Sequence, residues 1–348
     1  MTVAVTNAFP VLIGLVAGLL LTPVSKVLAR SVGAIDNPGE LKVHSKAMPR
    51  FGGSAIWAAT MLACAGGYVL LSPAVTKGGL LPVLIGATFM ALIGAVDDAI
   101  GLSPKVRLVV GVVVALGTAA AALNSESAVA RAQQIVFVGA SAVWLLGCAN
   151  AMNMLDGLDG LAAGVSAIAA VSIGMAALVA GNVPCGLLTF ALVGACLGFL
   201  RYNFRPASTF MGDVGSLFLG FTLASSVLLL LQGASGRPML PLVLGAMVAL
   251  GVPVGDMLLA MSRRLLNRKP VFQGDRSHFY DQLRDRFGLS VVKTVVTMYA
   301  LAAAFGVLGV GVSLLQWPQA VMATVGVVVV VVMGVLCGGF LRREADVA

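Results

Sequence analysis

VGSLFLGFTLASSVLLLLQ, residues 214–232, is an apolar run without a single charged side chain, and it decides the fold class. A helix of this length spans the ~30 Å of hydrocarbon in a lipid bilayer. A strand of a membrane barrel would instead be a segment of ~10 residues in which apolar and polar side chains alternate. The run therefore predicts a transmembrane helix.

Similar apolar runs recur along the chain, at residues 8–29, 52–72, 79–96, 106–123, 133–150, 161–181, 183–201, 238–261, 291–313 and 318–341. Of the 348 residues, 59% are hydrophobic and only 10% are charged, against roughly 25% charged residues in a soluble domain. Lipid offers the backbone no hydrogen-bond partners, so such runs cross it as helices. We expect an all-α integral membrane protein, a single polytopic domain over residues 1–348 that forms a bundle of about eleven transmembrane helices.

The basic residues indicate an orientation. If the N-terminus lies outside, the outer side carries only three of the 22 Lys and Arg residues, namely Lys77, Arg131 and Arg237. Cytoplasmic loops are rich in Lys and Arg, so the sequence predicts a multi-pass plasma-membrane protein with a cytoplasmic C-terminus. The net charge of +8 then reports topology, and no nucleic-acid partner is expected. Only Glu126 of the 14 acidic residues falls outside, which predicts an active site on the cytoplasmic face.

Two carboxylate motifs lie at the inner ends of apolar runs. Asp97 and Asp98 are adjacent just after the run 79–96, where a solvated helix end is the simpler alternative to a functional pair. Asp213 stands between glycines in FMGDVGS, directly before the run 214–232. An ordinary helix N-cap is the alternative for this residue.

The segment NAMNMLDGLDGLAAG, residues 150–164, has a polar side chain at every third position: Asn150, Asn153, Asp156 and Asp159. This spacing predicts that the four side chains begin as neighbours on one helical face. Gly157 and Gly160 would let the backbone approach a ligand closely. Because carboxylates at a membrane boundary are costly unless a cation compensates them, the segment indicates a binding site.

Together these clusters predict a site for a hard cation and for phosphates. Mg²⁺ takes oxygen ligands, usually one or two carboxylates with substrate phosphates and waters, and Mn²⁺ is the alternative. Lys105, Arg107 and Arg276 would bind phosphate oxygens from the same face. Such cations stabilise the charge that develops during phosphoryl transfer.

The motifs DDAIGL, NAMNMLDGLDGL and FMGDVGS, followed by a basic loop, resemble those of the polyprenyl-phosphate N-acetylhexosamine-1-phosphate transferases. The resemblance covers about residues 36–290 and is closer to the WecA and TagO branch than to the MraY branch, which has fewer helices. It implies transfer of a sugar-1-phosphate, most commonly N-acetylglucosamine-1-phosphate, from a UDP-sugar to undecaprenyl or another polyprenyl phosphate in the bilayer. UMP would be released, in the first membrane step of a cell-envelope polysaccharide pathway.

The resemblance also implies roles for individual residues. Asn153 and Asp213 match the positions that hold Mg²⁺, Asp97 and Asp98 match the catalytic acidic pair, and Asp156 matches a further catalytic carboxylate. The remaining candidates would bind substrate: Asn150, Asp159, Asn203, Lys105, Arg107, Arg276 and His278.

The long cytoplasmic loop 262–290 departs from the family pattern, because a histidine-rich motif is reduced to His278. We expect a short amphipathic helix over residues 278–287, capped by Ser277 and ended by Gly288. Arg276, at its start, would grip the donor diphosphate. An apolar stripe of this helix would lie on the membrane surface or on the bundle: Phe279, Leu283 and Phe287.

The sequence leaves several alternatives open. Asp256 shares a helical face with Arg263, either as a structural ion pair or as a carboxylate that supports the site. Transfer could be one in-line displacement or proceed through a covalent aspartyl-phosphate. A polyprenyl-pyrophosphate phosphatase and a secondary transporter are the competing classes, and a homodimer is neither indicated nor excluded.

Overall fold

The apolar runs fold into long helices, as their length and composition predict. The computed structural model describes residues 3–37, 47–75, 79–122, 128–231, 238–268, 270 and 278–341. Its helices are α1 (Val3–Ser31), α2 (Gly53–Val75), α3 (Leu80–Ile100), α4 (Pro104–Ala122), α5 (Ala128–Leu155), α6 (Leu161–Ala180), α7 (Val183–Asn203), α8 (Asp213–Leu231), α9 (Met239–Ala249), α10 (Gly251–Leu266), α11 (Phe279–Asp285), α12 (Val291–Ser313) and α13 (Trp317–Cys337). Within these described ranges, 10 helices could each cross a membrane, or up to 11 spans if the bent pair α9 and α10 counts as one. The predicted all-α polytopic membrane fold is confirmed.

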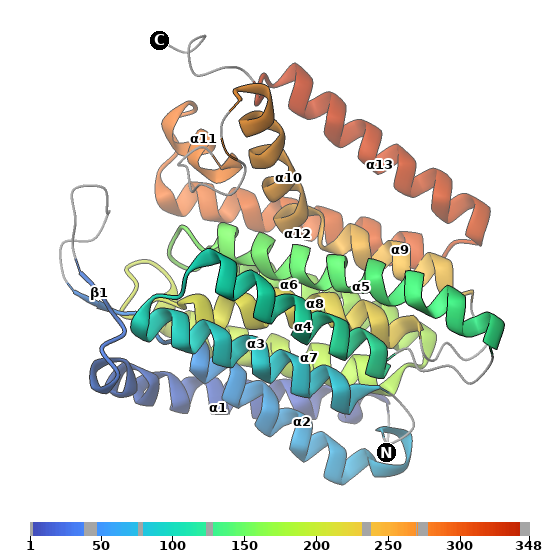
Figure 1. The fold of residues 1–348 in the computed structure, drawn as a ribbon, viewed down its shortest axis with the longest axis horizontal. Coiled ribbons are helices and arrows are strands. Elements are labelled where there is room, and N and C mark those ends of the chain that lie inside the picture. The colour runs from blue at the N-terminus through green and yellow to red at the C-terminus, as the bar shows by residue number, and fades with distance from the viewer. Residues whose placement is uncertain are drawn as a thin grey trace.

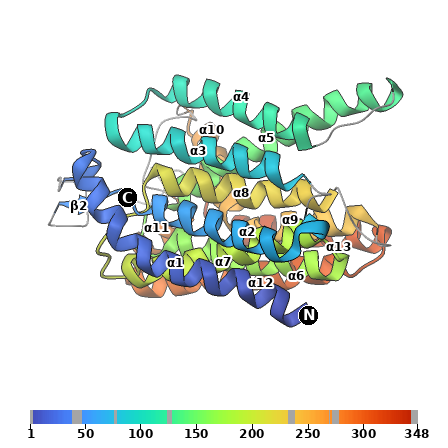
Figure 2. The same cartoon turned by 90° about the horizontal axis from the view of Figure 1, so that it is seen from below.

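Most of the long helices lie alongside one another in a single bundle (Figure 1). The N-terminus is at one end of this bundle, and α11 and the strand β1 (Ile35–Asp36) are at the other. Figure 2 shows α8 in the interior, between α4 on one side and α1 on the other. Nearly the whole of α8 is buried, whereas α13 is exposed along most of its length. Because α8 begins at Asp213, the most enclosed helix also carries a site residue at its first position.

Glycines allow α1 and α7 to pack with their backbones in close contact. Gly14 and Gly18 of α1 face Gly194 and Gly198 of α7, and a methyl group at Gly14 would collide with the carbonyl oxygen of Ala191. Lipid tails are as apolar as leucine, so membrane helices associate through such close packing rather than through the hydrophobic effect. The crossing fixes α1, and with it the loop that follows, against the rest of the bundle.

The run 238–261 is not one straight helix, and that prediction was wrong. It is divided into α9 and α10, which meet at Leu250 with a bend of 64°. Pro253 lies in the first turn of α10, and proline has no backbone N–H to offer the carbonyl of Ala249, four residues earlier. The second half is less apolar because it carries Asp256 and two arginines, but the pair together is still apolar enough for one span, so hydropathy alone did not reveal the break.

The predicted loop helix exists but is shorter than expected. It covers Phe279–Asp285, with His278 rather than Ser277 at the N-cap position, and Ser277 lies outside the described residues. Gly288 adopts φ = +67°, which fits the expected left-handed stop after the helix.

The apolar stripe of α11 meets the end of the chain. The rings of Phe279 and Phe287 lie 4.8 and 5.8 Å from the ring of Phe340, which follows α13. Leu283 is buried, while Phe287 remains half-exposed. The stripe therefore packs at least partly on protein, which was one of its two predicted positions.

A small sheet connects the first loop to the segment that precedes α8. Strand β1 pairs antiparallel with β2 (Met48–Pro49), and Arg50 forms a parallel bridge with Phe210. The backbone N–H of Phe210 donates to Pro49 O at 2.8 Å, and that of Gly52 donates to Phe210 O at 2.9 Å. These bonds bring residues distant in sequence to the start of α8.

Candidate active site

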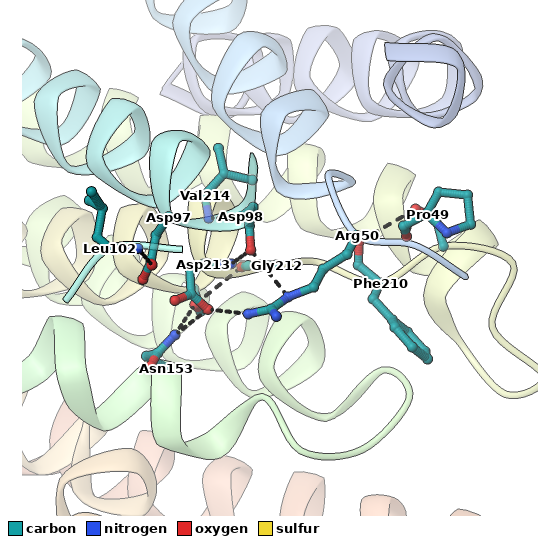
Figure 3. A network of polar contacts seen from close by, with 12 residues as sticks. Pro49, Arg50, Asp97, Asp98, Leu102, Asn153, Phe210, Gly212, Asp213 and Val214 are labelled. Carbon is teal, nitrogen blue, oxygen red and sulfur yellow. Dashed lines mark hydrogen bonds and ion pairs between the residues drawn. The ribbon is translucent and has the colours of Figure 1, made fainter. Parts of the chain in front are cut away.

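The carboxylate of Asp98 caps the first turn of α8. Its Oδ1 accepts from the backbone N–H of Asp213 and its Oδ2 from that of Val214, both at 2.9 Å (Figure 3). The first N–H groups of a helix have no partner within the helix, and a negative charge stabilises that end. The Asp98 side chain is fully buried. Through these two bonds it holds Asp213 in place.

Two glycines allow this close approach. A methyl group at Gly94 of α3 would collide with the carbonyl of Asp213, and one at Gly212 would collide with the Asp98 carboxylate and with Arg50 O. Gly212 also has φ = +75°, a conformation that side chains disfavour. The glycine before Asp213 is therefore required by the turn itself.

Asp97 and Asp213 converge on one positive charge. Arg107 Nη1 lies 2.9 Å from Asp97 Oδ2 and 2.9 Å from Asp213 Oδ2. The other oxygen of Asp97 accepts from the backbone N–H of Leu102 at 2.6 Å. Two carboxylates from different helices thus share the guanidinium of Arg107.

Arg50 binds the same cluster from the first loop. Its Nε lies 3.1 Å from Asp98 Oδ1, and its Nη2 lies 2.8 Å from Asp213 Oδ1. Burial opposes the charge on this side chain, but the carboxylates of Asp213 and Asp98 outweigh that effect and hold the pKa of Arg50 above its usual range. Figure 3 shows the guanidinium pointing at Asp213 from the side opposite Asp97.

Asn153 reaches the cluster and Asn150 does not. The Asn153 Nδ2 donates to Asp213 Oδ1 at 3.0 Å and to the Ser216 hydroxyl at 2.9 Å. Asn150, one turn earlier on α5, donates to the helix carbonyl of Leu146 at 2.8 Å. Asn153 and Asp213, the two residues expected to hold Mg²⁺, therefore lie side by side.

The four polar residues of 150–164 do not share a helical face, contrary to the prediction. Helix α5 ends at Leu155, and Asp156 and Asp159 lie in the turn before α6. Asp156 is half-buried near Asp213, Arg50 and Asp98. Burial raises the pKa of the Asp156 carboxyl well above its ordinary range, although the charge of Arg50 opposes the shift.

The glycines of this turn accommodate aromatic side chains. A methyl group at Gly157 would collide with the hydroxyl and ring of Tyr280, and one at Gly164 would collide with Tyr299. Gly160 has φ = +81°, and its carbonyl accepts from the Tyr299 hydroxyl at 2.6 Å. Protein groups thus lie against Gly157 and Gly160, and their role in ligand approach stays a prediction.

Asp159 and Asn203 bind the backbone of neighbouring loops. Asp159 Oδ2 accepts from the backbone N–H of Ala207 at 3.2 Å and lies 3.9 Å from Arg205 Nη1. Asn203 is buried, accepts from Gly160 N at 3.1 Å and donates to Thr209 O at 3.0 Å. Both residues tie the turn of 156–160 to the segment that leads into α8.

Asp256 interacts with the start of the loop helix. Its Oδ2 lies 2.8 Å from His278 Nδ1, and its Oδ1 accepts from the backbone N–H of Phe279 at 2.6 Å. Tyr280 then donates to Met154 O at 3.2 Å, at the end of α5. His278 therefore holds α11 against α10, and Tyr280 holds it against α5.

The two remaining basic candidates differ in what the structure describes. Lys105 is exposed near the start of α4. Arg276 lies outside the described residues. Their predicted roles in substrate binding therefore stay predictions.

The donor set suits a divalent cation that also binds phosphate. Among the described residues, no three His, Cys, Asp or Glu side chains form a metal-binding group on their own. Mg²⁺ commonly takes only one or two protein carboxylates and completes its shell with phosphates and waters. Asp213, with Asp97 on the other side of Arg107 Nη1, supplies carboxylate oxygens of this kind, and the Asn153 amide lies beside Asp213 Oδ1. Asn153 donates its NH₂ group there, so its amide would have to turn to offer oxygen to a cation.

Sequence reasoning missed Arg50 as a site residue. A lone arginine in a basic loop resembles every other cytoplasmic arginine. The available signal was its place in PRFGG, residues 49–53. Gly53 packs directly on Gly215, so the glycines of this motif allow the first loop to reach the start of α8.

Comparison with known proteins agrees with this geometry. Residues 80–231, which include Asp97, Asp98, Asn153 and Asp213, match the model of Glycosyl transferase family 4. A relative in Bacillus subtilis, named a probable undecaprenyl-phosphate N-acetylglucosaminyl 1-phosphate transferase, is 36% identical over 85% of this chain and 82% of its own. A Mycobacterium tuberculosis relative, named decaprenyl-phosphate N-acetylglucosaminephosphotransferase, is 33% identical over 83% of this chain and 78% of its own.

A third relative, from Thermotoga maritima, is named undecaprenyl-phosphate alpha-N-acetylglucosaminyl 1-phosphate transferase and is 27% identical over 84% of this chain and 87% of its own. These similarities extend over most of the helical bundle and beyond the carboxylate motifs alone. The chain belongs to glycosyl transferase family 4, among the polyprenyl-phosphate N-acetylglucosamine-1-phosphate transferases.

Proposed function

We propose that this protein transfers N-acetylglucosamine-1-phosphate from UDP-N-acetylglucosamine to undecaprenyl phosphate or a similar polyprenyl phosphate, with release of UMP. The named activities of its relatives support the sugar and the acceptor. The reaction would be an early membrane step of a cell-envelope polysaccharide pathway.

One observation supports the proposal: Asp97 and Asp213 each direct one oxygen at the Arg107 guanidinium, 2.9 Å from Nη1. Phosphoryl transfer needs a cation held between fixed carboxylates, because negative charge develops on the phosphate oxygens as bonds change. The carboxylates lie at the ends of membrane helices, where a lipid phosphate and a water-soluble donor can meet.

We infer that Asp213 and Asn153 hold Mg²⁺, with Asp97 beside them and Mn²⁺ as a substitute. When bound, the cation would neutralise the donor diphosphate and orient it. Asp98 keeps Asp213 in position through the two backbone N–H bonds at the start of α8. Arg107 contributes a permanent positive charge next to the same oxygens.

The chemistry proposed is one in-line displacement. An oxygen of the lipid phosphate attacks the phosphorus that carries the sugar, and the bond from this phosphorus to the bridging oxygen breaks. The electron pair of that bond leaves with UMP. A phosphomonoester has its second pKa near ~6 and is already largely ionised at neutral pH, so no strong base is required. Asp156 or Asp97 would accept any residual proton.

The orientation is proposed from charge. The end of the bundle that carries β1, α11 and the carboxylate cluster is the end where the basic loops gather, and such loops face the cytoplasm. We therefore place the active site and the C-terminus in the cytoplasm and the N-terminus outside.

Exchange of labelled UMP into UDP-N-acetylglucosamine tests the function. Purified protein should catalyse this exchange only when polyprenyl phosphate and Mg²⁺ are both present. A pyrophosphate phosphatase would show no exchange under any condition. Exchange without polyprenyl phosphate would instead support a covalent intermediate.

Stereochemistry at phosphorus provides a second, independent test of the mechanism. A donor made chiral with oxygen isotopes and sulfur at the transferred phosphorus should give product with inverted configuration. Retention would require two displacements and would contradict the single-step proposal.

A further inference from the structure

Arg50 occupies a position that a purely structural residue would not need. Its Nε contacts Asp98 Oδ1 at 3.1 Å and its Nη2 contacts Asp213 Oδ1 at 2.8 Å, while 41% of the side chain remains exposed. Asp98 is fully buried, whereas Asp213 is partly accessible. The guanidinium therefore stands at the boundary between the buried carboxylate and the accessible one.

The backbone of Arg50 is held firmly. Its N–H donates to Ala34 O at 2.9 Å, and the neighbouring bonds of Pro49 and Gly52 to Phe210 fix both sides of it. Only the side chain is therefore available to change partners. With its backbone fixed, the long Arg50 side chain can still carry its guanidinium from one anion to another nearby.

Asp213 and Asn153, which we infer to hold the cation, meet at Asp213 Oδ1, so a cation held there would compete with Arg50 for that oxygen. Asp213 Oδ1 already accepts from Arg50 Nη2 at 2.8 Å and from Asn153 Nδ2 at 3.0 Å. A divalent cation bound there would take the lone pair that Arg50 uses, and the two positive charges would repel each other. A phosphate on that cation would then be the nearest anion for the displaced guanidinium, whose planar fork matches phosphate oxygens.

We propose that Arg50 exchanges partners during donor binding: it pairs with Asp213 until a divalent cation takes that oxygen, and it then binds the donor diphosphate. The inference rests on the proposed function, because it takes the donor to be a nucleoside diphosphate sugar bound with a cation. It adds a substrate-binding residue from the first loop to those of α3, α4, α5 and α8.

The exchange predicts opposite effects on the cation and on the donor. In the Arg50→Gln protein, Mn²⁺ alone should bind about fivefold more tightly, because a partly exposed ion pair worth ~1 kcal/mol no longer competes. UDP in the presence of Mn²⁺ should bind about tenfold more weakly, because a hydrogen bond to a charged phosphate is lost. UDP carries the diphosphate without the sugar, so the result does not depend on which sugar is transferred.

Both affinities are measured on the full-length protein in detergent, Mn²⁺ by electron paramagnetic resonance and UDP by calorimetry. Arg30→Gln is the matched control, since Arg30 is an exposed arginine in the last turn of α1, and it should change neither affinity. Arg50→Lys keeps the charge and guards against misfolding of the glutamine variant. It should bind Mn²⁺ as the wild type does and bind UDP more weakly.

The outcomes separate this inference from the proposed function. If the wild type binds no Mn²⁺, the metal site itself is wrong. If the wild type binds Mn²⁺ and UDP but Arg50→Gln leaves both affinities within twofold, Arg50 does not exchange. If both affinities fall together in both Arg50 variants, Arg50 only supports the structure through Asp98, and the exchange is refuted.

Discussion

Replacing Asp98 with asparagine tests whether this residue positions the site or takes part in the chemistry. The carboxylate accepts two backbone N–H bonds at the start of α8 and contacts Arg50 Nε. Asparagine keeps one oxygen acceptor, so one bond survives without its charge. Its NH₂ group must face the other backbone N–H, which is then left buried without an acceptor.

The magnitude follows from these two bonds. A hydrogen bond to a charged group contributes ~1.5–3 kcal/mol, and a buried donor without a partner costs ~1–3 kcal/mol. A net loss of about 3 kcal/mol in the free energy that holds Asp213 in place corresponds to a fall in turnover of about 10²-fold. Because the same bonds hold α8 against α3, the thermal unfolding temperature should fall as well.

UMP release at saturating Mg²⁺ and substrates, together with thermal unfolding in detergent, measures both effects. Asp285→Asn is the control, since Asp285 is exposed at the end of α11, and it should change neither quantity. If Asp98→Asn loses activity but unfolds at the wild-type temperature, Asp98 acts on the substrates directly. If both activity and unfolding are unchanged, the capping argument is wrong.

Three further predictions concern the metal ligand, the close helix contact and the topology. Asp213→Asn should lower turnover by at least ~10²-fold, as the loss of an electrostatic stabiliser commonly does, and near-normal activity at saturating Mg²⁺ would exclude it as a ligand. Gly94→Ala should reduce turnover ~10-fold or more by pushing α3 away from Asp213, whereas Gly117→Ala, where a methyl group meets nothing within 4 Å, should not. In a cysteine-free background, a cysteine at position 103 should react only from the cytoplasm and one at position 235 only from outside; the reverse would overturn the orientation.

A last prediction concerns Arg276, in the part of the long loop that lies outside the described residues. Arg276→Ala should raise the KM for the UDP-sugar and lower kcat while leaving the KM for the lipid phosphate nearly unchanged. A rise in the lipid KM alone would instead make the loop a membrane-docking element.

The sequence by itself determined the fold class and most of the helices. Apolar runs such as 214–232 and 291–313 correspond closely to α8 and α12, because the thickness of the bilayer sets the length of a spanning helix. The same reasoning failed at Leu250, since a break within a run that is apolar as a whole does not change its hydropathy.

The sequence also identified Asp97, Asp98, Asn153 and Asp213, because polar residues at the ends of apolar helices are conspicuous. Only the tertiary structure decided what each of them does. Asp97 and Asp213 both pair with the Arg107 guanidinium. Both oxygens of Asp98 instead accept backbone N–H groups at the start of α8. Adjacent residues on a helix point about 100° apart, so neighbours in sequence can have different partners.

The role of Arg50, by contrast, could not be predicted from the sequence. In the sequence it is one basic residue among 22 Lys and Arg, and the charge rule, which assigns 19 of them to the inner side, cannot distinguish it. Its role depends on a backbone bridge to Phe210 and on ion pairs with Asp98 and Asp213. Composition and periodicity describe one segment at a time, whereas these contacts join segments far apart in the chain, and only the packing of the helices brings them together.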